Sequence, residues 1–223
     1  MTKAIILDMD DTLYLERDYV ISGFSAAAEA LESNELSNAF LKQAISIFEN
    51  GNRGNIFNLA LKALNQCDNP LIVSDMLTRY REHLPSISLC TDATRFLEDG
   101  KGKFPIGLIS DGYLPPQSQK VKALGLDRLI EKIVLTESLG REFWKPHTKA
   151  FKLIESHFGL QNSSCIYVGD NPRKDFDAPK LLGWTTIRIR RAGSLHYNSP
   201  DKPNFEPDYQ IENFEDLPSI LAA

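Results

Sequence analysis

Apolar residues recur every three or four positions through the first third of the chain, from about residue 18 to residue 83. This is the period of an amphipathic helix, and no segment within the stretch alternates as a strand does. Four apolar stripes follow one another, at 20–31, 40–48, 56–64 and 72–80. Four such helices in a row predict a small helical bundle inserted into another domain.

Strands and helices alternate after a short segment at 84–88, which we interpret as the return to the first domain. The predicted strands lie at 105–109, 132–135, 165–168, 185–189 and 208–211, and the predicted helices at 91–98, 117–124, 147–158, 174–182 and 214–221. This order indicates a parallel sheet with crossover helices. The apolar run Ile5-Ile6-Leu7 supplies one further strand before the helical stretch. We therefore predict an α/β core from residues 1–15 and 87–223 and an all-α insertion at 16–86.

The composition is that of an ordinary globular protein, with 42% apolar and 25% charged residues among 223. A formal net charge of −5 disfavours nucleic acid as a partner, because proteins that bind nucleic acid carry a basic face. No apolar stretch reaches the length that spans a bilayer, and no basic segment followed by an apolar one opens the chain. We therefore expect no membrane partner and no secretion.

Three cysteines are present in the sequence, Cys67, Cys90 and Cys165. Their odd number and wide spacing disfavour a disulfide framework and offer no CxxC metal site. Because free thiols are typical of a reducing compartment, we expect the protein to be cytoplasmic.

Polar residues of related chemistry follow three of the predicted strands. Ile5-Ile6-Leu7 is followed by Asp8, the strand at 105–109 by Ser110, and the strand at 165–168, after one glycine, by Asp170. The carboxyl ends of parallel strands lie at one edge of a sheet, where ligands bind in open α/β folds. We therefore expect Asp8, Ser110 and Asp170 to converge, since right-handed crossovers leave few other arrangements.

Asp10 follows Asp8 by two positions, and carboxylates this close repel each other unless a cation, a proton or solvent intervenes. Mg2+ is one remedy, since it takes oxygen ligands and needs only one or two carboxylates beside a substrate phosphate. An acidic surface turn after a strand is the alternative for this stretch alone. Lys145 precedes the predicted helix at 147–158, where its ammonium could neutralise a phosphate and hold a carboxylate nucleophile ionised. Taken alone, this lysine would be interpreted as a surface charge.

Together these residues meet the needs of phosphoryl transfer through a covalent aspartyl phosphate. That reaction depends on positioning and on neutralising charge around the phosphoryl oxygens. A carboxylate nucleophile divides it into two easier steps. A metal ion, a lysine, a hydroxyl and backbone N–H groups hold the oxygens.

With these motifs the chain resembles the haloacid dehalogenase (HAD) superfamily of phosphohydrolases, in the subgroup with a helical (C1-type) cap inserted after the first motif. The matching segments are Asp8-Met9-Asp10-Asp11-Thr12-Leu13 for DxDxT, Leu108-Ile109-Ser110-Asp111-Gly112 for the second motif, Lys145-Pro146 with Phe151 for the third, and Gly169-Asp170-Asn171-Pro172-Arg173-Lys174-Asp175 for GDxxxxD. The motifs come in the family's order, and the resemblance runs over almost the whole chain. It implies a Rossmann-like parallel sheet core with helices on both faces, which carries the catalysis, and a helical cap domain.

The resemblance implies a role for each residue of the first and fourth motifs. Asp8 would be the nucleophile and a Mg2+ ligand. Asp10 would protonate the leaving oxygen and then activate water; its backbone carbonyl would also bind Mg2+, and Thr12 would orient its side chain. Asp170 would complete the protein's metal ligands, with Asp175 beside it, either outside the set of ligands or bound to the metal through a water molecule.

The second and third motifs would hold the phosphate. Ser110 and the backbone N–H of Asp111 would bind the phosphoryl group, and Lys145 would pair with Asp8 and with the phosphate. The acid at Asp10 favours phosphate esters over the halides that name the family. An alkoxide leaving group needs a proton, and a halide does not.

The expected function is hydrolysis of a small phosphorylated metabolite, a sugar phosphate or a nucleoside monophosphate, by a Mg2+-dependent phosphatase. A phosphomutase of the same family uses the same motifs and remains an alternative. A non-enzymatic phospho-accepting regulatory domain is an alternative of another class, which the inserted helices and Asp10 disfavour. We expect a monomer or a weak dimer.

Arg53 lies in the loop at 50–55, which joins the second and third predicted helices. Polar, glycine-bearing loops of this length are common helix connections. The alternative is a specificity loop in which Arg53 contacts an anionic or hydroxylated substrate, and the sequence leaves both interpretations open.

Overall fold

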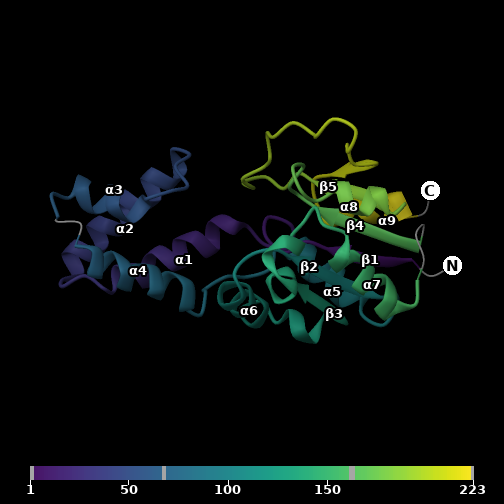
Figure 1. The fold of residues 1–223 in the computed structure, drawn as a ribbon, viewed down its shortest axis with the longest axis horizontal. Helices are drawn as coiled ribbons and strands as arrows, with labels where there is room; N and C mark the ends of the chain where they lie inside the picture. Colours follow the sequence, from purple (N-terminus) through teal and green to yellow (C-terminus); the bar gives the residue numbers. More distant parts are fainter. Residues whose placement is uncertain (1–2, 67–68, 161–163, 222–223) are drawn as a thin grey trace. The chain divides into compact units, whose positions relative to one another are not determined.

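The structure, a computed structural model, describes residues 3–66, 69–160 and 164–221. The chain divides into two compact units, Met1–Arg17 with Ile87–Ala223 and Asp18–Ser86 (Figure 1). Cys165 is a free, buried cysteine, whereas Cys67 lies outside the described residues. Within the described ranges, no helix is both long and apolar enough to cross a membrane.

The larger unit is built on a parallel sheet of six strands in the order β3-β2-β1-β4-β5-β6. The strands are β1 Ala4–Leu7, β2 Ile106–Ser110, β3 Lys132–Leu135, β4 Cys165–Gly169, β5 Thr185–Ile189 and β6 Tyr209–Ile211. Every neighbouring pair is parallel. Because β1 pairs with β2 on one side and with β4 on the other, it lies inside the sheet, and all of its residues are buried. The predicted α/β class is confirmed.

Helices cover this sheet and connect its strands (Figure 1). They are α5 Thr91–Gly100, α6 Leu114–Ala123, α7 Lys149–Phe158, α8 Asp177–Leu181 and α9 Leu217–Leu221, with 3-10 turns at Leu126–Arg128, Thr136–Leu139, Arg141–Phe143 and Phe214–Asp216. Phe151 and Ile154 of α7 pack in one apolar cluster with Ile6 of β1 and Ile109 of β2. Burial of such side chains contributes about 1.5–3 kcal/mol each, so this face of the sheet is a major source of stability.

Four of the described helices in the larger unit, α6 to α9, begin two or three residues from the predicted position, and for two of them the local structure gives the reason. The helix predicted at 117–124 starts at Leu114, because Pro115 and Pro116 occupy its first turn, where their missing N–H groups need no intrahelical partner. The helix predicted at 174–182 starts only at Asp177. The preceding residues form a turn in which the Asp175 carboxylate accepts the Asn171 N–H at 2.8 Å.

All helices and strands assigned in the described residues of the smaller unit are helices, as the four apolar stripes predict. Its helices are α2 Asn34–Glu49, α3 Ile56–Ala63 and α4 Pro70–Glu82, together with all but the first two residues of α1 Glu16–Ala28. Aromatic rings from all four helices pack edge to face or tilted at centroid distances of 5.7–6.2 Å; they are Phe24, Phe40, Phe48, Phe57 and Tyr80. Such pairs add about 0.5–1.5 kcal/mol each to the burial of their surfaces.

Candidate active site

Three polar residues end or follow adjacent strands at the carboxyl edge of the sheet. Asp8 follows β1, Ser110 is the last residue of β2, and Asp170 follows β4. All three are buried. Because Leu7 pairs with Leu108 of β2 and with Val168 of β4, the three strands reach this edge in register.

A group of three carboxylates is assembled at this edge by Asp8, Asp170 and Asp175. One oxygen of each lies within 4.8 Å of the others, and all three residues are buried. Asp170 Oδ2 has no hydrogen-bond partner among the described residues. Burial, with the charge of Asp175 adding to it, raises the pKa of Asp170 well above its usual value. Three converging, desolvated carboxylates with an unpartnered oxygen fit a hard cation such as Mg2+, which prefers oxygen ligands.

The glycine before Asp170 makes room for this group. A Cβ at Gly169 would lie 2.6 Å from Asp175 Oδ2, closer than a Cβ atom approaches a neighbouring oxygen. The Gly-Asp pair of the fourth motif therefore brings the backbone of β4 close to the Asp175 carboxylate.

Lys145 joins two of the carboxylates. Its Nζ lies 2.8 Å from Asp8 Oδ1 and 2.8 Å from Asp175 Oδ1, and it donates to the Tyr167 hydroxyl at 3.0 Å. Burial alone would lower the pKa of Lys145, but Asp175 and Asp8 outweigh burial and hold that pKa well above its usual value. Burial also raises the pKa of Asp8, to about 6, against the opposing charge of Lys145. The lysine therefore stays an ammonium beside the predicted nucleophile.

The Asp10 side chain has a different set of partners. Lys120 Nζ lies 2.6 Å from its Oδ1, Gln117 Nε2 donates to its Oδ2 at 2.9 Å, and the Tyr14 hydroxyl donates to Oδ1. Burial alone would raise the pKa of Asp10, but Lys120, with Tyr14 and Gln117, brings it below its usual value. The carboxylate group at the sheet edge thus contains Asp175 and not the Asp10 side chain. Metal binding by the Asp10 backbone carbonyl stays a prediction.

Asp111 connects the second, third and fourth motifs through its side chain. Its Oδ1 accepts the Thr136 hydroxyl at 2.7 Å and the Lys145 N–H at 3.1 Å, and its Oδ2 lies 3.3 Å from Lys174 Nζ. The second motif predicts a role only for the backbone N–H of Asp111. The structure adds that its carboxylate fixes the backbone at Lys145.

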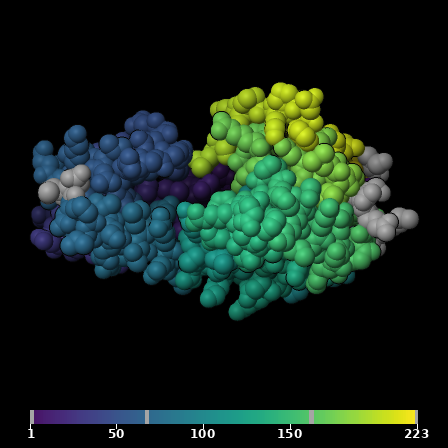
Figure 2. Space-filling view, in the orientation of Figure 1, coloured from purple at the N-terminus to yellow at the C-terminus, as the bar shows by residue number. Residues whose placement is uncertain are grey.

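The loop of the first motif is held by residues that follow β5. The Thr12 carbonyl accepts Arg191 Nε at 3.2 Å and Nη2 at 2.9 Å, and the Asp11 carboxylate accepts the Leu195 N–H at 2.8 Å. Arg191 also forms a two-pronged ion pair with Asp92 at 2.8 and 2.9 Å. The segment after Leu195, coloured yellow in the space-filling view, forms part of the surface of the larger unit (Figure 2). Thr12 Oγ1 is buried without a hydrogen-bond partner in the described ranges, so its orienting role stays a prediction.

Arg53 lies in the smaller unit and is engaged by its own loop. Its Nη1 donates to the carbonyls of Phe48 at 2.5 Å and Asn52 at 2.8 Å, and its guanidinium lies 4.1 Å from the centre of the Phe48 ring. These contacts close the connection between α2 and α3. Contact of Arg53 with a substrate stays a prediction.

Gln117 and Lys120 are site residues that the four motifs do not predict. They lie three positions apart on α6, on the buried stripe that also holds Val121 and Leu124. A polar pair on the apolar face of a helix directly after the second motif is the signal that could have found them. Tyr14 and Tyr167 carry no comparable signal, because buried tyrosines are ordinary core residues.

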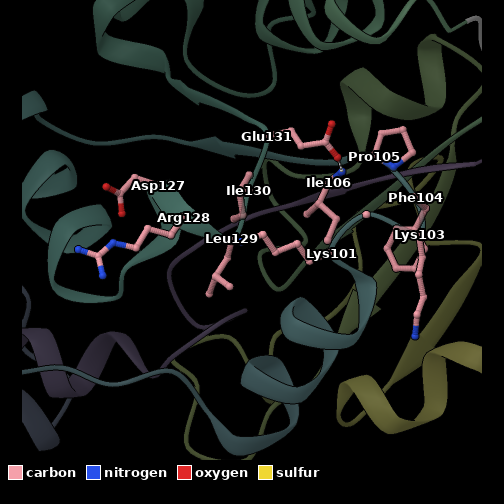
Figure 3. Close-up of a pocket in the computed structure, with 11 residues that line it drawn as sticks. Lys101, Lys103, Phe104, Pro105, Ile106, Asp127, Arg128, Leu129, Ile130 and Glu131 are labelled. Atoms are coloured by element: carbon pink, nitrogen blue, oxygen red, sulfur yellow. Dashed lines mark hydrogen bonds between the residues drawn. The ribbon is translucent and has the colours of Figure 1, made fainter.

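A surface hollow in the larger unit lies away from this site. It is lined by residues 101–106, which lead into β2, and by residues 127–131, which precede β3 (Figure 3). Both segments belong to the amino ends of their strands, whereas Asp8, Ser110 and Asp170 stand at the carboxyl ends. The hollow is therefore at the opposite edge of the sheet from the candidate site.

Comparisons with known proteins agree with this geometry. Residues 5–189 match the model of the family described as haloacid dehalogenase-like hydrolase. The chain is 27% identical over 229 residues to a glyceraldehyde 3-phosphate phosphatase of Methanocaldococcus jannaschii, covering 99% of this chain and 97% of the relative. It is also 27% identical over 233 residues to a glyceraldehyde 3-phosphate phosphatase of Methanopyrus kandleri, with the same coverage of both chains. Its fold is similar to the magnesium-bound crystal structure of the putative HAD-hydrolase YfnB from Bacillus subtilis, with a TM-score of 0.69, 19% identity and coverage of 100% and 99%. The resemblance predicted from the four motifs is confirmed, and the chain belongs to the haloacid dehalogenase-like hydrolase family.

Proposed function

We propose that the protein is a Mg2+-dependent phosphatase that hydrolyses a small phosphomonoester through a phosphoaspartyl intermediate on Asp8. The observation that carries the proposal is the buried Asp8 carboxylate, 2.8 Å from the Lys145 ammonium and grouped with Asp170 and Asp175. The enzyme class, a phosphoric monoester hydrolase of the haloacid dehalogenase type, agrees with the family and with the two phosphatases to which the chain is similar.

Asp8 and Asp170 would hold the cation, with Asp175 beside them and the Asp10 carbonyl as a further ligand. When bound, Mg2+ would neutralise negative charge on the phosphoryl oxygens. Lys145 supplies a second positive charge at the same place and keeps Asp8 ionised. Ser110 and the backbone N–H of Asp111 would bind the remaining phosphoryl oxygens.

Two steps then follow from the positions of the carboxylates. In the first step, a carboxylate oxygen of Asp8 bonds to phosphorus and the ester P–O bond breaks. Its electron pair goes to the leaving oxygen, which takes a proton from Asp10. In the second step, Asp10 takes a proton from a water molecule whose oxygen bonds to phosphorus. The bond between phosphorus and Asp8 breaks, and phosphate leaves.

The substrate that we propose to test first is a phosphorylated sugar of low molecular mass. The two relatives are named for glyceraldehyde 3-phosphate, which belongs to this class, and their lengths match that of the chain. A nucleoside monophosphate is the second class to test. We propose that the helical insertion at 16–86 is the cap that selects among these substrates, with Arg53 as a candidate contact.

The test is release of 4-nitrophenol and phosphate from 4-nitrophenyl phosphate, with Mg2+ and after chelation. A panel of sugar phosphates and nucleotides follows. We expect Mg2+-dependent turnover by the wild type and none by Asp8→Asn. The exposed Asp127 provides the control, since Asp127→Asn makes the same chemical change at the opposite edge of the sheet from the carboxyl strand ends and should keep full activity. Unchanged turnover in Asp8→Asn would dismiss the assigned nucleophile.

The same assay separates the two alternatives. A long-lived phosphoenzyme after mixing with a sugar bisphosphate, with little phosphate released, would favour a phosphomutase. A stable aspartyl phosphate with no turnover of any phosphomonoester would favour a phospho-accepting regulatory domain.

A further inference from the structure

Both oxygens of the Asp10 carboxylate are bound by one helix. Lys120 Nζ lies 2.6 Å from Oδ1, and Gln117 Nε2 donates to Oδ2 at 2.9 Å. The two residues stand three positions apart on α6, so their side chains leave the same face of the helix. Both are buried, and burying a lysine is costly unless its charge is paired. The buried side chains of Gln117 and Lys120 therefore hold both oxygens of the Asp10 carboxylate. We call this pair of residues the clamp.

Gln117 also ties the clamp to the second motif. The same Nε2 lies 2.8 Å from Ser110 Oγ and 2.9 Å from the Asp111 carbonyl oxygen. Gly112, at a φ of +137°, makes this approach possible, because a Cβ there would lie 2.9 Å from Cδ of Gln117. The position of Asp10 is thus fixed relative to Ser110, the residue predicted to bind the phosphoryl group.

A third donor reaches Asp10 from its own loop. The Tyr14 hydroxyl donates to Oδ1, and residues 10 and 14 also form a backbone bridge. A free aspartate side chain populates several rotamers, and three donors on two oxygens select one of them. The carboxylate is therefore oriented by Gln117, Lys120 and Tyr14 together.

We propose that Gln117 and Lys120 are positioning residues for the acid–base group of the reaction. They hold the Asp10 carboxyl where its proton can reach the leaving oxygen. This inference rests on the proposed phosphatase function. As the ester bond breaks and its electron pair goes to the leaving oxygen, Asp10 gives up its proton and becomes a carboxylate. The Lys120 ammonium and the Gln117 amide face that new negative charge and keep their own protons.

The proposal predicts a dependence on the leaving group that a purely structural ion pair would not give. Nitrophenolate leaves readily without a proton, whereas phenolate depends more strongly on one, so phenyl phosphate needs general acid help and 4-nitrophenyl phosphate needs little. General acid catalysis contributes about 10²- to 10⁴-fold. A variant that loses part of this help should slow phenyl phosphate hydrolysis more than 4-nitrophenyl phosphate hydrolysis.

The experiment compares kcat on the two esters for wild type, Lys120→Met and Lys120→Arg, with Mg2+ present. For Lys120→Met we expect a loss on phenyl phosphate about tenfold larger than the loss on 4-nitrophenyl phosphate. Lys120→Arg retains the positive charge and should restore most of the wild-type ratio. Lys122→Met is the matched control, because Lys122 is exposed on the same helix and should leave both rates unchanged. Equal losses on the two esters, or no loss on either, would overturn the proposal.

A second arm asks whether Lys120 acts through Asp10. In an Asp10→Asn background, adding Lys120→Met should change the phenyl phosphate rate by less than about twofold, because the group it positions is gone. A further loss as large as in the wild-type background would overturn the proposal. If circular dichroism shows that Lys120→Met does not fold, Gln117→Leu takes its place with the same expected ratio. A wild type that hydrolyses neither ester would refute the proposed function itself, which distinguishes that failure from failure of the clamp.

Discussion

Replacing Lys145 with methionine removes the ammonium that lies between the Asp8 and Asp175 carboxylates. Methionine keeps most of the buried stem, so the change isolates the charge and its hydrogen bonds. The side chain contributes two contacts of 2.8 Å to carboxylates and one of 3.0 Å to the Tyr167 hydroxyl, all buried. Breaking a buried ion pair by removing one partner costs about 3–5 kcal/mol, because the other charge is left without compensation.

This loss of unfolding free energy lowers the melting temperature, Tm. For a chain of this size, 1 kcal/mol shifts Tm by about 2–4 °C, so Lys145→Met should melt about 6 to 20 °C below the wild type in chelator. Mg2+ should raise the Tm of the variant more than that of the wild type, because ligands that bind only the folded state stabilise it and the variant's carboxylates lack their ammonium. Turnover should nevertheless fall about 10²- to 10³-fold, as when an electrostatic donor to a transition state is removed.

The assay is thermal unfolding followed by circular dichroism near neutral pH, in chelator and in excess Mg2+, alongside phosphate release. Lys152→Met is the control, because Lys152 is exposed on α7 and should leave Tm and turnover unchanged. If Lys145→Met melted within about 2 °C of the wild type in chelator, the lysine would contribute less than about 1 kcal/mol. This result would refute the view that the Lys145 ammonium stabilises the fold by pairing with the buried Asp8 and Asp175 carboxylates.

Two further predictions concern the loops around the site. Gly112→Ala should lose activity as well as stability, because its Cβ would meet the Gln117 side chain at 2.9 Å; Gly102→Ala, also at positive φ but with no atom within 4 Å, should lose stability alone. Turnover and Tm measured on both variants would check this, and equal activities would contradict it. Burial alone would raise the pKa of Asp92, but hydrogen bonds from Arg191 and the Phe214 N–H hold it below its usual value. The carboxylate therefore stabilises the fold above about pH 4, and this contribution is lost as the pH falls further and the carboxylate takes up a proton. Urea unfolding between about pH 5 and pH 3 should show a smaller loss of stability for Asp92→Asn than for the wild type, and parallel curves would refute this assignment.

The sequence predicts the sheet well because its strands are short apolar runs bounded by turn residues. The strands at 132–135 and 185–189 have the bounds that the pattern predicts, and the four helical stripes correspond to four helices. Helix starts were predicted less well near the site. Asp175 fits a helical pattern, yet its carboxylate accepts the Asn171 N–H and belongs to the group of three carboxylates at the sheet edge, so α8 begins later. Local sequence propensity does not predict where a helix begins when a side chain near its start binds residues of other motifs.

Some residues of the candidate site can be predicted from the sequence, and others cannot. Residues at strand ends were predictable, because strand polarity alone brings Asp8 and Asp170 to one edge. The partners of Asp10 were not, since Lys120 lies 110 positions away on a helix whose rotation about its own axis decides what it faces. Asp111 shows the same limit, because its backbone belongs to a motif while its carboxylate meets Lys174, which comes 63 residues later.

The loop that carries Asp10 is held in place by residues that come much later in the chain. Its Thr12 carbonyl and Asp11 carboxylate are bound by residues 179 and 184 positions further along. During synthesis, the segment with the predicted nucleophile Asp8 is therefore made well before the residues that hold its loop. A product truncated before Arg191 would have a first-motif loop that lacks these hydrogen bonds.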